Sequence, residues 1–370
     1  MNPDHSIFIP ASRPAHKPGA HALVYFIPGN PGLIEYYNVF LKFLRVLLDR
    51  SQTAVAYDIF GRSLYGFHDD DHAPFTNSSP PYSLEEQIHK SYASVAERRI
   101  EDSSRPEENG KAYDFVVLIG HSVGSYITLE IFHRHHHNPS LARHLKLYHG
   151  ILLFPTVTHI AKSPSGRRLK ALNDYAFLSQ NLHRVAKALV RPWPKSFLQF
   201  LCRTFMGFSP DAARITAEFL KSRDGIWQGL HMGKDEMVTI SDDKWDEELW
   251  EVFHDAEEHR HKLPKFMFFF AKQDHWVAND IRDQFIQKLE KHANREGPDY
   301  KKGKTEVVVE QEGKVAHAFC TREMGNIVVA DRVKTWLDQI QENFAPYDPD
   351  KERETRVLDE AKVLAGTIMR

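Results

Sequence analysis

Residues 115–126 place the strongest constraint on how this chain can fold, because an apolar strand pattern changes there into a helical one. The run Phe-Val-Val-Leu-Ile at 115–119 is followed by Gly-His-Ser-Val-Gly at 120–124. Apolar residues then recur near helical spacing as far as Ile131. Glycines two residues to either side of a serine leave room for a sharp turn that lifts its hydroxyl out of a sheet. The pattern predicts a strand, a tight turn with Ser122 at its apex, and a helix.

Short apolar runs alternate along the chain with longer helical patterns. Several of these runs are apolar on both faces, which is typical of strands in a parallel sheet covered by helices on both sides. The alternating order predicts a doubly wound, mostly parallel α/β fold. The predicted strands are 22–27, 53–57, 115–119, 150–154, 266–270 and 305–309, and the predicted helices are 37–48, 84–100, 123–133, 280–291 and 322–340.

One interval breaks this alternation. Residues 155–264 show helical periodicity and proline-containing turns without a convincing strand pattern. We therefore expect a helical lid or cap inserted between two late strands. The predicted organisation is a first core part at 1–154, the insertion at 155–264, a second core part at 265–345 and a tail at 346–370.

Two later loops supply groups that could activate the Ser122 hydroxyl. Hydrolases of the α/β fold carry a serine, an acid and a histidine in that chain order, the last two on loops after late strands. Asp274 follows the predicted strand at 266–270, and His317 follows the predicted strand at 305–309. Open α/β sheets place their active sites at these carboxyl ends of the strands. We therefore predict that Ser122, Asp274 and His317 form a catalytic triad.

The roles in this triad follow from proton chemistry. His317 would take the proton of Ser122 during attack on a carbonyl and return it to the leaving group. Asp274 would hold the imidazole tautomer and stabilise its charged form. The chain contains 22 histidines, so the prediction depends on chain order. The rival acids are Asp280 and Asp255, and the rival base is His275.

A tetrahedral intermediate also needs two backbone donors for its negative oxygen. The N–H of Val123, directly after the serine, is the first candidate. The second is expected on the loop Ile-Pro-Gly-Asn-Pro-Gly at 27–32, where the two prolines are excluded because they lack an N–H. Gly29, Asn30 and Gly32 remain, and we choose Asn30.

Bulk charge and hydropathy exclude two classes of partner. The 48 Lys and Arg residues nearly balance the 50 Asp and Glu residues, so charge gives no reason to expect nucleic acid. The most apolar stretches fall far below the roughly 20 residues that span a bilayer, and we expect no transmembrane segment. The first residues lack the pattern of a secretory signal, so export is not expected.

The basic apolar segment, residues 183–208, has a composition that suits a surface contact. It contains five Arg or Lys residues and many apolar side chains but no Asp or Glu. Such a segment can insert its apolar side into a phospholipid monolayer while its cations meet anionic head groups. The same apolar side could instead cover an acyl pocket, and the sequence leaves both interpretations open.

Three motifs carry a resemblance to a known family. They are Phe-Ile-Pro-Gly-Asn-Pro-Gly at 26–32 followed by two tyrosines at 36–37, Gly-His-Ser-Val-Gly-Ser-Tyr at 120–126, and His-Ala-Phe at 317–319. With these motifs the chain resembles the lipid droplet-associated hydrolase family of α/β-hydrolase proteins, over about residues 20–345. The resemblance implies an α/β-hydrolase fold and a serine esterase or lipase without metal or organic cofactor. It also implies that Ser122, Asp274 and His317 inherit the triad roles.

The expected substrates are neutral lipid esters such as sterol esters or acylglycerols. The expected location is the cytosolic side of lipid droplets, reached peripherally through residues 183–208, with the endoplasmic reticulum surface and the cytosol as alternatives. Two other functions are compatible with the same sequence features. The chain could be a droplet-binding scaffold with little turnover, or a transacylase in which an alcohol replaces water.

Overall fold

A seven-stranded sheet forms the centre of the computed structural model, which describes residues 5–12, 19–50, 54–101, 106–173, 176–241, 245, 249, 266–293 and 305–342. The strand order is β1-β3-β2-β4-β5-β6-β7, with β1 antiparallel to β3 and all other pairs parallel. The strands are β1 (Ser6–Ile9), β2 (Ala20–Ile27), β3 (Val55–Arg62), β4 (Phe115–His121), β5 (Leu147–Leu153), β6 (Phe266–Phe270) and β7 (Thr305–Val309).

Burial explains why the central strands are apolar on both faces. Every residue of β2, β4 and β6 is buried, because helices cover both sides of the sheet. The predicted parallel α/β sheet is therefore confirmed. The edge strand β1 was not predicted, because its four half-buried residues are too few to establish a period.

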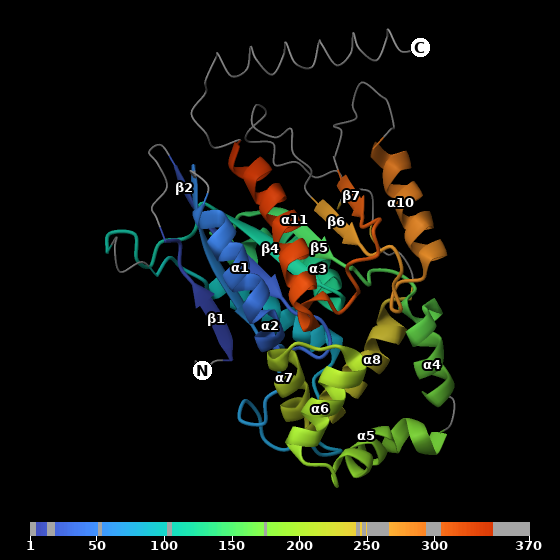
Figure 1. Ribbon diagram of the computed structural model, residues 1–370. Helices are drawn as coiled ribbons and strands as arrows, with labels where there is room; N and C mark the ends of the chain where they lie inside the picture. Colours follow the sequence, from blue (N-terminus) through green and yellow to red (C-terminus); the bar gives the residue numbers. More distant parts are fainter. Residues whose placement is uncertain are drawn as a thin grey trace, which may run out of the picture.

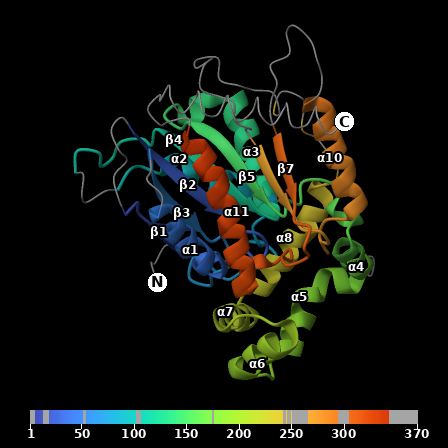
Figure 2. The ribbon, with the colours of Figure 1, turned by 45° about the horizontal axis from the view of Figure 1, so that its top comes forward.

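Helices pack in two layers against this sheet (Figures 1 and 2). Helices α1 and α11 lie side by side on one face, and α2 and α3 lie on the other. The core helices are α1 (Asn38–Asp49), α2 (Leu84–Glu97), α3 (Val123–His137), α10 (Asn279–Ala293) and α11 (Glu323–Glu342), and the 3-10 helices are η1 (Ile34–Tyr37), η2 (Pro139–Ala142), η3 (Ile160–Lys162) and η4 (Phe319–Thr321).

The described part of residues 155–264 is helical and contains no strand, as expected from its periodicity. Its helices lie beyond the carboxyl ends of the parallel strands, with α5 and α6 farthest from the sheet (Figure 1). They are α4 (Pro164–Asn173), α5 (Ala176–Val190), α6 (Lys195–Met206), α7 (Pro210–Lys221) and α8 (Gly225–Thr239). We call α4–α8 the helical insertion. The domain boundaries stay a prediction, and the tail at 346–370 lies outside the described residues.

Among the described residues, each helix is too short or too polar to cross a membrane.

A buried carboxylate links four segments around the sheet. Asp58 in β3 is only 2% exposed. Its Oδ1 accepts the N–H of Ala11, which follows β1. Its Oδ2 is hydrogen-bonded to His21 Nε2 in β2 at 3.0 Å and accepts the hydroxyl of Tyr113, just before β4, at 2.9 Å. Because one side chain satisfies groups from three other parts of the chain, its loss cannot be compensated locally.

Replacing Asp58 by alanine is expected to lower the free energy of unfolding by about 3 kcal/mol, because buried polar groups lose their acceptor. Urea denaturation of wild type and variant measures this difference. The control is Asp280→Ala at the exposed start of α10, which is expected to change stability by less than about 0.5 kcal/mol. Equal losses in the two variants would contradict a special role for Asp58.

Candidate active site

Ser122 occupies a strained turn between β4 and α3. Its backbone angles are φ 55° and ψ −123°, a conformation that costs a residue with a side chain about 1–3 kcal/mol. A β-carbon at Gly120 would lie 2.3 Å from the carbonyl oxygen of Gly124, and one at Gly124 would lie 2.3 Å from that of Ile27. Both positions therefore require glycine, and the strand, turn and helix predicted around Ser122 are present.

The three side chains predicted for the triad meet in this structure. Ser122 Oγ lies 2.9 Å from His317 Nε2, and His317 Nδ1 lies 2.7 Å from Asp274 Oδ2. They come from the loops after β4, β6 and β7, so the parallel strands bring their carboxyl ends to one edge of the sheet. Segments up to 195 residues apart in the chain are thereby joined by hydrogen bonds.

Two backbone N–H groups, as well as His317, stabilise Asp274 as a carboxylate. Its Oδ1 accepts the N–H groups of Trp276 at 2.7 Å and Val277 at 3.2 Å, while its Oδ2 faces His317. Burial by itself would raise the pKa of Asp274, but the facing imidazole and the two N–H groups outweigh burial and lower the pKa. The carboxylate is therefore ionised at neutral pH and oriented toward the ring.

The rival residues do not take these places. Asp280, at the start of α10, and His275 are exposed. Asp255 lies outside the described residues. Among the described candidates, Asp274 is the acid hydrogen-bonded to His317.

Two residues that the sequence-based reasoning did not single out join the elbow to its neighbouring loops. The hydroxyl of Tyr37 lies 2.7 Å from Nδ1 of His121, and Nε2 of His121 lies 2.9 Å from the carbonyl oxygen of His317. Burial and the neighbouring His317 lower the pKa of His121 to about 3, so its ring is neutral. The carbonyl oxygen can only accept, so Nε2 carries the proton and Nδ1 accepts the Tyr37 hydroxyl.

The same tyrosine engages the loop after β2. Its oxygen accepts the N–H of Gly29, at 3.1 Å. Gly29 is thereby occupied, although it lies against the elbow, where its β-carbon would be 3.0 Å from Ser122 Cβ. Gly32 packs against other side chains, those of Leu64 and Phe67. The contact with Tyr37 therefore removes Gly29 from the three predicted donors, and Asn30 and Gly32 stay predictions.

Asn30 itself contacts the helical insertion. Its Nδ2 donates to the carbonyl oxygen of Gly229 at 2.9 Å and to Oε1 of Glu236 at 3.0 Å, both in α8. No local pattern marks Glu236 as a partner of a residue 206 positions away, so only the packed tertiary structure brings the two together.

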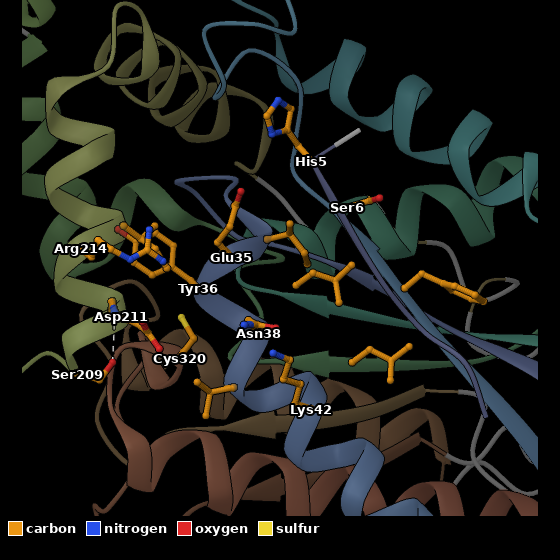
Figure 3. A pocket seen from close by; sticks show the side chains of 17 residues that line it. His5, Ser6, Glu35, Tyr36, Asn38, Lys42, Ser209, Asp211, Arg214 and Cys320 are labelled. Carbon is orange, nitrogen blue, oxygen red and sulfur yellow. Dashed lines mark hydrogen bonds between the residues drawn. The ribbon is translucent and has the colours of Figure 1, made fainter. Parts of the chain in front are cut away.

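A cavity of about 410 Å³ lies between β1, η1, α1 and α7 (Figure 3). Its lining includes Tyr36 and Cys320 but none of the three triad residues. Charged side chains of Glu35, Lys42 and Arg214 surround it together with apolar residues of β1. We assign this cavity no part in the triad.

The strand order, the elbow after β4 and the helices inserted between β5 and β6 together define an α/β hydrolase. A family described as "Lipid-droplet associated hydrolase" matches residues 20–320, and the chain belongs to this family. The predicted fold class and family resemblance are therefore confirmed.

Curated relatives bear the same description. The chain is similar to the lipid droplet-associated hydrolase of Mus musculus, with 26% identity over 264 residues, covering 69% of this chain and 70% of that protein. The human protein is 24% identical over 335 residues, covering 86% of each chain. A solved serine hydrolase from Cycloclasticus zankles aligns at 13% identity with a TM-score of 0.48, covering 90% of this chain and 94% of that one.

The low pKa of His121 predicts a pH dependence of stability. Below the ordinary histidine pKa of about 6.5, His121 is protonated in the unfolded chain but stays neutral in the folded protein. The contribution of this residue to stability therefore falls as the pH drops from about 6.5 toward 3, by about 1.4 kcal/mol per pH unit. His121→Gln lacks this titration, so its stability should decrease less between pH 6 and pH 5. Urea denaturation at both pH values tests the difference, and parallel losses would contradict it.

Proposed function

We propose that this protein is a serine esterase in which Ser122 is the nucleophile, His317 the base and Asp274 the orienting acid. The observation that carries the proposal is the continuous hydrogen-bond series from Ser122 through His317 to Asp274. The carboxylate accepts the Nδ1 proton of the imidazole, so Nε2 presents its lone pair to the serine hydroxyl. This arrangement supports proton removal from Ser122 during attack on an ester carbonyl.

The proposed reaction has two stages. In the first, Ser122 Oγ forms a bond to the ester carbonyl carbon while His317 Nε2 takes its proton, and the same proton then leaves with the alcohol. In the second, water attacks the acyl carbon while His317 takes one of its protons, the bond from that carbon to Ser122 Oγ breaks, and the proton passes from His317 to Ser122 Oγ as the carboxylic acid leaves. Asp274 stabilises the imidazolium in both stages.

The negative oxygen of each tetrahedral intermediate would be bound by the N–H groups of Val123 and Asn30. Val123 begins α3, where the first N–H groups have no partner within the helix and the helix dipole favours negative charge. Support for Asn30 comes from the engagement of Gly29 by Tyr37. Such donors are each worth about 10²–10³ in turnover.

The substrates we propose are neutral lipid esters, either sterol esters or acylglycerols, at the surface of lipid droplets. The family description and the names of the relatives support a droplet-associated hydrolase. The helical insertion supports a contact with lipid, because its outer helices expose large apolar side chains. Leu189 is 68% exposed, Phe200 54% and Phe205 76%.

Helix α6 of the basic apolar segment has a buried side and an exposed side. Leu198 and Cys202 of α6 are buried, whereas Phe200, Phe205 and Met206 of the same helix are exposed. The exposed basic side chains Arg184, Arg191, Lys195 and Arg203 lie in the same segment. We propose that this outer side of α5 and α6, far from the sheet in Figure 1, contacts the phospholipid monolayer.

A fluorophosphonate probe tests the nucleophile. Wild type is expected to be labelled and to hydrolyse a 4-nitrophenyl ester, whereas Ser122→Ala loses labelling and at least about 10³-fold of its turnover. Ser125→Ala is the matched control, because this nearby hydroxyl donates to the carbonyl of Gly120 and should not affect labelling. A folded wild type that is not labelled would contradict the esterase and favour the scaffold. Transfer of the acyl group mainly to an added alcohol would favour the transacylase.

Binding to a triacylglycerol emulsion coated with phosphatidylcholine and phosphatidylserine tests the lipid contact. Replacing Phe200 and Phe205 together by serine should reduce binding at least about 10-fold, since each buried aromatic side chain contributes roughly 1.5–3 kcal/mol. The control replaces Met324 and Ile327, which are 59% and 42% exposed on α11, by serine. Unchanged binding of the double phenylalanine variant, or equal losses in both, would discard this surface.

A further inference from the structure

The loop that carries Asn30 is held from two sides. On the core side, the N–H of Gly29 donates to Tyr37. On the other side, the Asn30 amide donates one proton to Gly229 and one to Glu236, both in α8 of the helical insertion. A carbonyl oxygen such as that of Gly229 can only accept, so the amide nitrogen of Asn30 is the atom that donates to α8.

Helix α8 lies in contact with this side chain. A β-carbon at Gly229 would lie 3.4 Å from Asn30 Oδ1, and one at Gly233 would lie 3.6 Å from Asn30 Nδ2. Two glycines one helical turn apart therefore present bare backbone to the amide of Asn30.

Glu236 is a buried carboxyl that the proposed reaction does not use. It is 5% exposed, and a buried polar group is costly unless it is hydrogen-bonded. Burial raises the pKa of Glu236 to about 8, with Asp235 adding to this rise and the Asn30 bond opposing it. At neutral pH the group is therefore mostly protonated and still offers Oε1 to the Asn30 amide. Glutamine closely imitates this neutral form.

We propose that Glu236 is a positioning residue that, through the side chain of Asn30, orients the Asn30 N–H toward the oxyanion. The inference rests on the proposed esterase function. The side chain and the N–H of Asn30 share one α-carbon, so fixing the amide restricts rotation of the adjoining peptide. The helical insertion thereby completes the oxyanion hole, and movement of α8 relative to the core changes stabilisation of the transition state.

The expected kinetic signature follows from where this interaction acts. An oxyanion donor binds the transition state more strongly than the ester, so its misplacement lowers kcat with little change in KM. A displacement of about 1 Å can cost up to about 10²-fold in rate. Glu236→Ala should therefore lower kcat about 10-fold to 100-fold and leave KM within about twofold, whereas Glu236→Gln should restore most of the rate.

Asp235→Ala supplies a matched control on the same helix. Asp235 accepts the N–H of Leu84 at the start of α2, so it also joins α8 to the core, but away from the loop of Asn30. A general loosening of the helical insertion would lower kcat in both alanine variants, whereas positioning of Asn30 predicts a loss in Glu236→Ala alone. Equal losses would overturn the proposal, as would a Glu236→Gln variant as slow as Glu236→Ala.

A second measurement does not depend on turnover. Hydrogen–deuterium exchange of peptides covering residues 28–37 should increase at least about threefold in Glu236→Ala and remain near wild type in Glu236→Gln and Asp235→Ala. Unchanged exchange in Glu236→Ala would overturn the positioning role even in an inactive protein. A wild type without probe labelling or ester turnover would instead refute the esterase, so the two failures are distinguishable.

Discussion

The turn at Ser122 depends on two backbone segments that approach each other without side chains between them. The carbonyls of Gly124 and Ile27 occupy the space that β-carbons at Gly120 and Gly124 would need. This contact brings the end of β2 against the start of α3, so the loop after β2 lies beside the serine. The strain of a positive φ at Ser122 is sustained because β4 and α3 are both buried on their packed faces. The proposed oxyanion donors are neighbours for the same reason.

Burial separates the titratable groups around the site into neutral and charged ones. It lowers the pKa of His121 and raises that of Glu236, so both side chains are neutral at pH 7 and serve as hydrogen-bonding groups. Asp274 is different, because an imidazole and two N–H groups stabilise its carboxylate. Asp274 therefore places a negative charge against the His317 ring, where it would stabilise an imidazolium. The neutral groups hold the loops without adding charge near the serine.

The periodicity of the chain predicted much of the fold because burial on both faces leaves a clear local pattern. The runs that became β2, β4 and β6 are apolar throughout, and α3 and α11 began within a few residues of their expected positions. Strand β1 was not predicted, because four half-buried residues at an antiparallel edge are too few to show a periodic pattern of apolar residues. Asp274 was separable from Asp280 only by burial and by its contact with His317.

The sequence alone determined the elbow, the alternating sheet and the three loops where reactive side chains would lie. Each of these features can be read from the local spacing of residues and from their order along the chain. Spacing and order also narrowed the second oxyanion donor to three residues. Only the tertiary structure decided that Tyr37 contacts both Gly29 and His121, and that Glu236 reaches Asn30 across 206 residues. Hydrogen bonds between distant segments leave no periodic trace in a sequence, because each partner is selected by geometry that exists only after the sheet and the helical insertion have packed together.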